Sequence, residues 1–173
     1  MKITTSSKKD IPVIQKLYAD ARSFQKIKSA VLWPDFSDQF IESEIEKGHQ
    51  WKIELNTTIA CVWTIAFSDA EIWGEKNKKP AIYLHRIATN ANYRGHHLLT
   101  YIIEWAKKYC KENKLQFVRM DTVGHNDGLI AYYQKAGFTF LGAKPLEHTE
   151  NLPSHYQKAP VCLFEMEIKN PPR

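Results

Sequence analysis

The stretch from Ile82 to Phe140 constrains the fold of this chain more than any other part of the sequence. It holds an apolar segment (residues 81–89), a basic turn, a long amphipathic segment (95–113) and a second apolar segment (116–122). Apolar residues recur at helical spacing in the amphipathic segment, which predicts a helix between two strands. Because such a crossover joins parallel neighbours in one sheet, the sequence predicts a sheet with a parallel strand pair.

The remaining segments predict antiparallel strands and further helices. We expect strands over residues 2–5, 51–55, 59–67, 138–142 and 160–168. We expect helices after the capping residues Asp10 and Ser37, the second with Phe40, Ile41 and Ile45 inward and Gly48 at its end, and a short helix over residues 127–136. Residues 68–80 have the composition of a polar loop, and residues 145–157 are too irregular to assign. The order predicts a mixed α+β fold with a mostly antiparallel sheet.

Length and composition are those of one globular domain. The chain has 173 residues, of which 43% are hydrophobic and 25% charged, enough for one core. No apolar run approaches the ~20 residues that span a bilayer, and the first residues lack the apolar core of a secretory signal. We therefore expect a single domain over residues 1–173, located in the cytoplasm and not bound to a membrane.

The formal net charge of +5 is mild and is not gathered in one basic block. On the predicted 95–113 helix, lysines alternate with Glu104 and Glu112, which favours a solvated face over a nucleic-acid surface. A modest positive charge also suits a polyanionic cofactor. We expect no nucleic-acid partner, although strongly salt-dependent binding of DNA or RNA would revive that hypothesis.

The three cysteines, Cys61, Cys110 and Cys162, lie far apart in apolar or amphipathic segments. An odd number of cysteines without a secretory signal indicates free thiols rather than disulfides. Free cysteine is among the most buried residue types, so we expect all three to pack in the core.

The turn before the 95–113 helix is suited to bind an anion, because helix N-termini expose unpaired N–H groups and a partial positive charge. Gly95 lets the backbone approach an anion closely. The predicted donors are the backbone N–H groups of Gly95, His96, His97, Leu98 and Leu99, the side chains of Arg94, His96 and His97, and the hydroxyl of Thr100. Taken alone, a glycine and an arginine before a helix also fit an ordinary turn.

The adjacent histidines do not indicate a metal site. Neighbouring residues on a helix point about 100° apart, and no cysteine or carboxylate shares the spacing of His96 and His97. We expect no metal ion.

A second motif follows the strand at 116–122. Asn126 opens a short helix that carries Tyr132 and Tyr133 and ends at Gly137-Phe138. Because Asn126 and Tyr133 are about two helical turns apart, their side chains share a face. The spacing alone fits two core tyrosines equally well.

Together these motifs resemble those of the GNAT acyltransferases. The family carries Gln/Arg-x-x-Gly-x-Gly/Ala at this strand–helix junction, and alignment on Gly95 places Asn92 at the first position and His97 at the last, where the family has a small residue. The family's second hallmark, an Asn, a short helix, a Tyr and Gly-Phe, matches Asn126, Tyr133 and Gly137-Phe138. The resemblance implies the GNAT fold, with helices on both faces of its sheet.

The resemblance also implies a function: transfer of the acetyl group of acetyl-CoA to a primary amine of a small molecule or peptide, by direct attack in a ternary complex. Coenzyme A would be the co-substrate. The backbone of Ile87, Ala88 and Thr89 would pair with its pantetheine amides, and an N–H group near Ile87 or Ala88 would polarise the thioester carbonyl. The turn would bind the pyrophosphate, and Asn126 would contact the pantetheine arm or a phosphate. Tyr133 would protonate the departing sulfur as the general acid.

The general base is open. Many family members use a glutamate on the strand that corresponds to residues 81–89, where this chain has Tyr83, His85 and Arg86. His85, with an unperturbed pKa of ~6.5, is the candidate, and a structural histidine beside a sheet fits equally well.

A non-catalytic acyl-CoA-binding module of the same fold is the alternative. The departure at His97 and the missing strand glutamate favour it, whereas Tyr133 in register argues against it. In the family the acceptor lies against the first two helices and the loop before the last strand, so five aromatic residues either line that cleft or belong to the core: Trp33, Phe36, Trp63, Trp73 and Tyr156. The sequence leaves the acceptor and a homodimer open.

Overall fold

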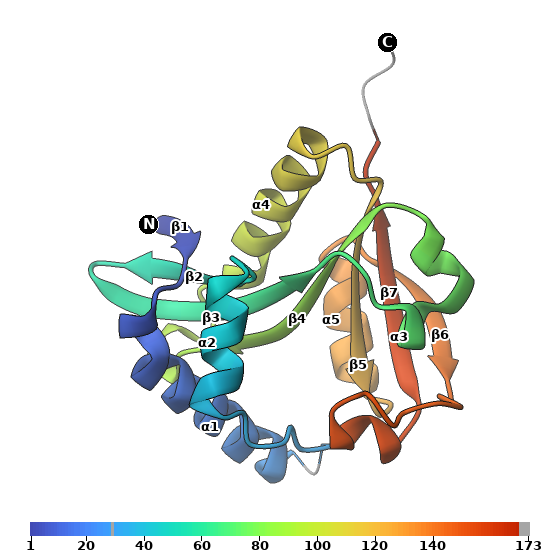
Figure 1. Ribbon diagram of the computed structural model, residues 1–173, viewed down its shortest axis with the longest axis horizontal. Helices are drawn as coiled ribbons and strands as arrows, with labels where there is room; N and C mark the ends of the chain where they lie inside the picture. The colour runs from blue at the N-terminus through green and yellow to red at the C-terminus, as the bar shows by residue number, and fades with distance from the viewer. Residues whose placement is uncertain (29, 170–173) are drawn as a thin grey trace. The chain divides into compact units, whose positions relative to one another are not determined.

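The computed structural model describes residues 1–28 and 30–169 (Figure 1). Contacts within the chain group it into two units. The first unit contains residues 1–65 and 85–98, and the second contains residues 66–84 and those from 99 onward. The strand β4 (Ala81–Thr89) contributes its first half to the second unit and its second half to the first.

The first unit holds three strands and two helices besides its half of β4. These are β1 (Lys2–Thr5), α1 (Ile11–Ile27), α2 (Asp38–Glu46), β2 (Gln50–Leu55) and β3 (Thr58–Ala66), with short 3₁₀ turns at Lys8–Asp10 and Ala91–Tyr93. β2 pairs antiparallel with both β1 and β3. The predicted strands of this region are confirmed within one residue at their ends, and helices follow Asp10 and Ser37 as predicted.

The β2–β3 hairpin turns on two residues in the left-handed region, Asn56 (φ 46°) and Thr57 (φ 65°). Two-residue turns with both central residues at positive φ match the right-handed twist of the flanking strands. Asn tolerates this conformation better than most residues, which explains why the chain reverses there.

The core of the first unit lies between its helices and strands. Ile14, Leu17 and Tyr18 of α1 form one buried cluster with residues of α2, β3 and β4, namely Ile41, Ile59, Val62 and Ala88. These three residues form the buried stripe of α1. The prediction that Phe40 points inward was wrong: its side chain is 37% exposed and stacks on Phe36 with ring centroids 5.3 Å apart.

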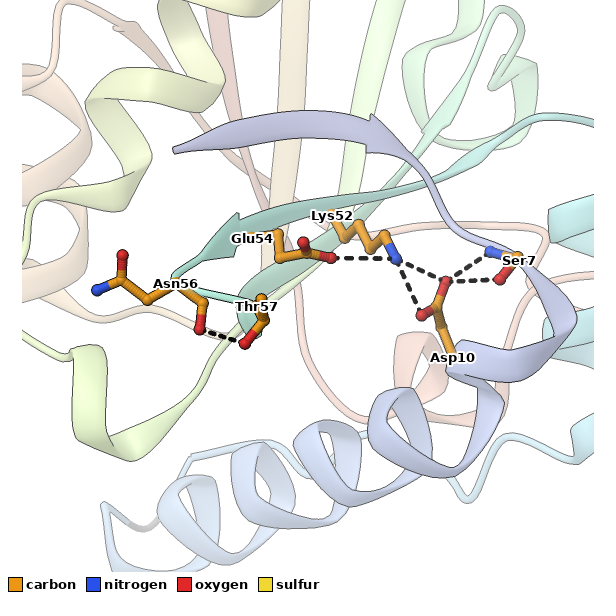
Figure 2. Close-up of polar contacts among 6 residues, drawn as sticks. All are labelled: Ser7, Asp10, Lys52, Glu54, Asn56 and Thr57. Carbon is orange, nitrogen blue, oxygen red and sulfur yellow. Dashed lines mark hydrogen bonds and ion pairs between the residues drawn. The ribbon is translucent and has the colours of Figure 1, made fainter.

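A polar chain ties the start of α1 to β2 (Figure 2). The carboxylate of Asp10 accepts the backbone N–H of Ser7 (2.7 Å) and the ammonium of Lys52 (2.9 Å), and Lys52 also pairs with Glu54 at 3.6 Å. Although partial burial alone would raise it, these hydrogen bonds hold the pKa of Asp10 below its usual value. Asp10 therefore precedes the helix as predicted, but its carboxylate bonds to Ser7 and Lys52 instead of capping α1.

The second unit holds the remaining elements and the first half of β4. These are α3 (Ala70–Trp73), α4 (Leu98–Glu112, from Leu99 on), β5 (Phe117–Val123), α5 (Asp127–Lys135), β6 (Thr139–Lys144) and β7 (Val161–Glu167), with 3₁₀ turns at Gly74–Lys78 and Ser154–Gln157. The parallel pairing of β4 with β5 extends from Ala81 and Phe117 to Leu84 and Met120. β7 pairs antiparallel with both β5 and β6.

These pairings confirm the predicted fold class, a mixed α+β fold whose strands are mostly antiparallel with one parallel pair. Successive residues of β7 point to opposite faces of the sheet. On one face Leu163 belongs to the buried cluster that contains Ile72 and Trp73 of α3, and on the other the ring of Phe164 lies 5.1 Å from that of Tyr133 in α5. Helices thus cover both faces of the second unit's strands.

Two segments of the second unit differ from their predictions. Residues 68–80 are not simply a polar loop, because α3 buries Ile72 (1% exposed) and Trp73 (2%). Two apolar residues in a polar stretch are too few to show a periodicity. The helix expected from Gly95 begins at Leu98, and residues 145–157, left unassigned, bring Leu146, Leu152 and Tyr156 against the same buried cluster.

The second unit contains a buried cation, the guanidinium of Arg119. Arg119 of β5 is fully buried, and its Nε atom lies 2.8 Å from Oε2 of Glu165, the residue directly opposite on β7. Its Nη1 donates to the carbonyl of Lys76 (2.8 Å) and the hydroxyl of Tyr83 (2.9 Å). Arg119 therefore ties the segment before β4 to three strands.

All three cysteines are buried free thiols, as predicted. Burial raises the pKa of Cys61 to about 11 and that of Cys110 to about 12, and also raises that of Cys162. Their role in the folded chain is packing.

Candidate active site

The predicted anion-binding turn lies between the 3₁₀ turn Ala91–Tyr93 and the first residue of α4, Leu98. Gly95 and His97 both have left-handed backbones, with φ of 84° and 53°. A Cβ atom added to Gly95 would meet nothing within 4 Å. Glycine is therefore favoured at this position by the left-handed backbone and not by a lack of space. The turn residues Arg94, Gly95, His96 and His97 are exposed.

The donors of this turn are those of a helix start. Because α4 begins at Leu98, the first N–H groups of the helix, including those of Leu98, Leu99 and Thr100, lack partners within it. The N–H group of His96, in contrast, donates to the carbonyl of Tyr93 (3.3 Å) and closes the turn. Leu98 and Leu99 bury their side chains (4% and 7% exposed), which fixes the start of the helix.

Arg94 supplies a cation at this turn. Its guanidinium carbon lies 4.4 Å from the ring centroid of Phe24 in α1, a cation–π contact. Within residues 1–28 and 30–169, no hydrogen bond or ion pair engages this guanidinium. Its N–H groups are therefore available to an anion.

The second half of β4 carries the residues predicted to contact the pantetheine arm. Ile87 and Thr89 are partly buried and Ala88 is 2% exposed. The hydroxyl of Thr89 donates to the sulfur of Cys61 (3.5 Å), and the N–H group of Asn90 donates to the carbonyl of Ala60 (2.9 Å). These contacts place this half of β4 beside β3 within the first unit.

Arg86 interrupts the regular backbone of β4 with a φ of 51°. Its Nη2 atom lies 2.9 Å from Oε2 of Glu44 in α2, and both side chains are mostly buried (16% and 13% exposed). The guanidinium also lies over the rings of Phe40 (4.9 Å) and Phe36 (5.5 Å). A non-glycine residue at positive φ costs free energy and is typical of functional sites. The sequence does not reveal this contact, since nothing in the spacing of Glu44 and Arg86 indicates a pair.

His85, the candidate base, is partly buried and directly precedes Arg86. Its carbonyl accepts the hydroxyl of Thr64 at 3.3 Å. His85 and the turn residues up to Leu98 belong to the first unit, whereas Leu99, Thr100, Asn126 and Tyr133 belong to the second.

Tyr133 of α5 packs its ring among aromatic neighbours of the second unit. Ring centroids lie 5.1 Å from Phe164, 5.6 Å from Tyr132 and 6.3 Å from Phe138. Burial, aided by the negative charges that Tyr132 and Asp121 can carry, raises the pKa of Tyr133 above its usual value. In the described part of the chain its hydroxyl has no hydrogen-bond partner. Tyr133 therefore presents a phenol that is held in place and stays protonated, while Tyr132 is 46% exposed and outside the core.

Asn126 occupies the N-cap position of α5. Its Oδ1 atom accepts the backbone N–H of Leu129 at 3.0 Å. The residue is exposed, and its amide NH₂ group remains available for another contact. Capping alone would account for an asparagine here.

The second unit also contains two neighbouring carboxylates that no sequence motif indicates, Asp69 and Asp121. Oxygen atoms of Asp69 and Asp121 lie within 4.8 Å of each other, and both residues are partly buried. The hydroxyl of Tyr156 donates to Oδ2 of Asp121 at 2.8 Å. The available signal was the presence of two charged residues, Arg119 and Asp121, in a mainly apolar strand.

The five aromatic residues considered as the lining of the acceptor cleft fall into a buried group and a partly buried group. Trp63, Trp73 and Phe36 are buried core residues, with exposed fractions of 0%, 2% and 8%. Trp33 and Tyr156 are partly buried. Tyr156 lines a cavity of about 370 Å³ formed by residues 145–160 of the second unit.

A left-handed turn before a helix start, with an exposed arginine beside it, can bind a phosphate group. The sequence pattern of the Acetyltransferase (GNAT) family matches residues 15–138 of this chain. The chain therefore belongs to the GNAT acetyltransferase family.

Individual relatives agree with this assignment. The chain is 29% identical over 107 residues to the uncharacterized N-acetyltransferase YesJ of Bacillus subtilis, and the matched part covers 60% of this chain and 59% of that relative. A GNAT-family acetyltransferase structure from Listeria monocytogenes superposes with a TM-score of 0.77 at 24% identity, covering 96% of this chain and 94% of that one. The structure of yncA from Salmonella typhimurium, which contains its cofactor acetyl-CoA, superposes with a TM-score of 0.69 at 12% identity, covering 100% and 96%.

The backbone of the turn suggests a second register for the family signature. Gly95 takes the glycine position when the motif is aligned on it, but His97 also has the left-handed φ that favours glycine. A register with Arg94 at the first position and His97 at the glycine position puts the buried Leu99 at the final, small position. The register on Gly95 therefore leaves one bulky residue, His97, where the family has a small one, and the register on Arg94 leaves two, His97 and Leu99.

No helix in the described part of the chain is both long and apolar enough to cross a membrane.

Proposed function

We propose that this protein is an N-acetyltransferase that moves the acetyl group of acetyl-CoA to the primary amine of a small molecule or peptide. The observation that carries the proposal is the turn before α4, where two left-handed residues precede a helix start and Arg94 holds its donors unengaged. Helix N-termini with such turns bind phosphate groups. Membership of the GNAT family and the acetyl-CoA in the yncA structure support coenzyme A as the source of those phosphates.

The turn and the second half of β4 bind the co-substrate in this proposal. The N–H groups of Leu98, Leu99 and Thr100, with the side chains of Arg94, His96 and His97, bind the pyrophosphate. The backbone of Ile87, Ala88 and Thr89 pairs with the pantetheine amides as an added strand would. Asn126 contacts the pantetheine arm through its amide NH₂ group.

The reaction is a direct attack of the amine on the thioester. The amine nitrogen forms a bond to the carbonyl carbon, the bond from carbon to sulfur breaks, and the products are an amide and free coenzyme A. A backbone N–H group near Ile87 or Ala88 stabilises the carbonyl oxygen. Tyr133 donates its proton to the departing sulfur, since a phenol with a raised pKa is protonated throughout the neutral range.

The base that takes the amine's proton is one of two groups. His85 is the candidate from the sequence, and the carboxylate of Asp121, partly buried and hydrogen-bonded by Tyr156, is the candidate from the structure. The pH–rate profiles of His85→Gln and Asp121→Asn decide between them. In the variant that lacks the base, the fall in rate at low pH that protonation of the base causes should disappear. Two profiles that match wild type would exclude both.

The first test is a calorimetric titration with acetyl-CoA, with ATP as the control anion. Micromolar binding of acetyl-CoA but not of ATP supports the proposal, and a panel of amines scored by thiol release then tests for turnover. Binding without turnover of any amine would favour the non-catalytic acyl-CoA-binding module. Absence of binding would refute the proposal.

A further inference from the structure

The ring of Phe24, near the end of α1, lies under the guanidinium of Arg94 in the turn before α4. The two residues are far apart in the sequence but belong to the same unit, with the guanidinium carbon 4.4 Å from the ring centroid. Phe24 is 41% exposed, so it contributes little to the core. Neither the sequence motifs nor the proposed reaction gives this side chain a role.

Stacking holds an arginine without using its hydrogen bonds. The guanidinium contacts a ring through its flat face, whereas its N–H donors lie in the plane and point away from the ring. Arg94 has no other side-chain partner within residues 1–28 and 30–169. The contact with Phe24 therefore restricts the Arg94 side chain without engaging its N–H donors.

A second cation shares the same ring. The Nζ atom of Lys28, which follows α1, lies 5.7 Å from the ring centroid of Phe24. Two positive charges beside one exposed ring make this end of α1 attractive to an anion. The exposed His96 belongs to the same turn as Arg94.

We infer that Phe24 is a positioning residue that orients Arg94 toward a phosphate of coenzyme A, an inference that rests on the proposed function. An unrestrained arginine samples many rotamers, and ordering it on binding weakens affinity. The ring of Phe24 restricts those rotamers before the ligand arrives. Only a flat aromatic ring can do so, so leucine at this position loses the effect and tyrosine retains it.

The test is a double-mutant cycle on acetyl-CoA affinity, measured by titration calorimetry of the full chain. We expect Phe24→Leu to raise Kd by about threefold to tenfold, within the range for ordering one rotamer-rich side chain on binding. Phe24→Tyr should stay within about twofold of wild type, since its ring stacks equally well. In an Arg94→Gln background, Phe24→Leu should change Kd no further, because the residue that it positions is gone.

The control for general effects on α1 is Val13→Ala, at a residue of the same helix with a similar exposed fraction (40%). Its Kd should equal that of wild type. Thermal unfolding of every variant, followed by circular dichroism, separates a lost contact from lost folding. The resonance of the Arg94 side-chain N–H, shifted by the ring current of Phe24, should move in Phe24→Leu and not in Val13→Ala.

The outcomes separate this inference from the function on which it rests. Unchanged Kd in Phe24→Leu, or an equal loss in the Arg94→Gln background, overturns the positioning role while acetyl-CoA binding by wild type stands. Failure of wild type to bind acetyl-CoA overturns the proposed function, and with it the phosphate role of the stacked pair.

Discussion

Arg86 in the first unit and Arg119 in the second have similar partners but different backbones. Each pairs with a glutamate, Glu44 at 2.9 Å and Glu165 at 2.8 Å, and each lies over aromatic rings. Arg119 is fully buried in a regular strand directly opposite its partner, whereas Arg86 is partly exposed and has a φ of 51°.

The difference separates a group that stabilises the fold from one that shapes a site. Arg119 has no contact with solvent, although its partner Glu165 is 14% exposed, so the role of this guanidinium is internal. A strained backbone persists only where its surroundings hold it, and such strain is typical of functional positions. Arg86 directly follows His85 and directly precedes Ile87–Thr89, the residues proposed to contact the co-substrate.

The largest expected effect is on the arginine of the second unit. Glu165→Gln leaves the guanidinium of Arg119 buried without its counter-charge, which should lower the free energy of unfolding by about 3–5 kcal/mol. Urea unfolding followed by tryptophan fluorescence measures the change. The matched control is Glu167→Gln, an exposed position on the same strand, and an equally small loss in both variants would contradict the internal role of Arg119.

Glu44→Gln is the corresponding change in the first unit. The loss should be smaller, about 1–2 kcal/mol, because Arg86 and Glu44 keep some contact with solvent. Without the ion pair the strained backbone at Arg86 can relax, so affinity for acetyl-CoA should fall several-fold, which calorimetry measures. The exposed Glu46 provides the control variant, Glu46→Gln. A stability loss with unchanged affinity would break the comparison, since Arg86 would then resemble Arg119.

Tyr133→Phe tests whether the second unit also carries chemistry. The substitution keeps the ring contacts with Phe164 and removes only the hydroxyl, so stability should be unchanged. Turnover with an accepted amine should fall at least about tenfold, the typical loss of a general acid. Tyr132→Phe, on the exposed neighbour, should behave as wild type. Wild-type turnover in Tyr133→Phe would remove the assignment.

His97 is the second strained residue of the first unit. His97→Gly removes the penalty of a left-handed conformation and should raise the free energy of unfolding by about 1 kcal/mol. Gly95→Ala should lower it by a similar amount, because an alanine there is strained although there is space for its Cβ. Thermal unfolding of the two variants should therefore shift in opposite directions, and a shift in the same direction would contradict the strain at His97.

The smallest expected effect concerns Tyr133, whose protonation should cause no change in activity or phenolate absorbance below about pH 10. The folded pKa of Tyr133 is raised, so its stabilising protonation is fully present below the unfolded value of ~10 and is lost as the pH rises through the folded value. Activity should show no alkaline decline from this group below about pH 10. Phenolate absorbance of wild type minus Tyr133→Phe should stay flat up to that pH, and a rise near neutrality would contradict the raised pKa.

The sequence predicted the elements whose signals are local. Period and capping located β4, α4, β5 and α5, and the spacing of Asn126 and Tyr133 placed both on one short helix. Pairs distant in sequence were not predicted, although charged residues in mainly apolar strands were visible, among them Arg119 and Glu165. The left-handed backbones of Arg86 and His97 depend on tertiary contacts, and for that reason no residue pattern signals them.

The three buried cysteines allow exposure of the core to be measured by thiol reactivity. A thiol reacts as the thiolate, and burial with a raised pKa suppresses that form at Cys61, Cys110 and Cys162. A thiol-reactive dye would therefore record the release of coenzyme A during turnover without background from the thiols of the protein. With the protein alone, the same dye would react slowly, and its rate of reaction would report how often a molecule opens and exposes its core.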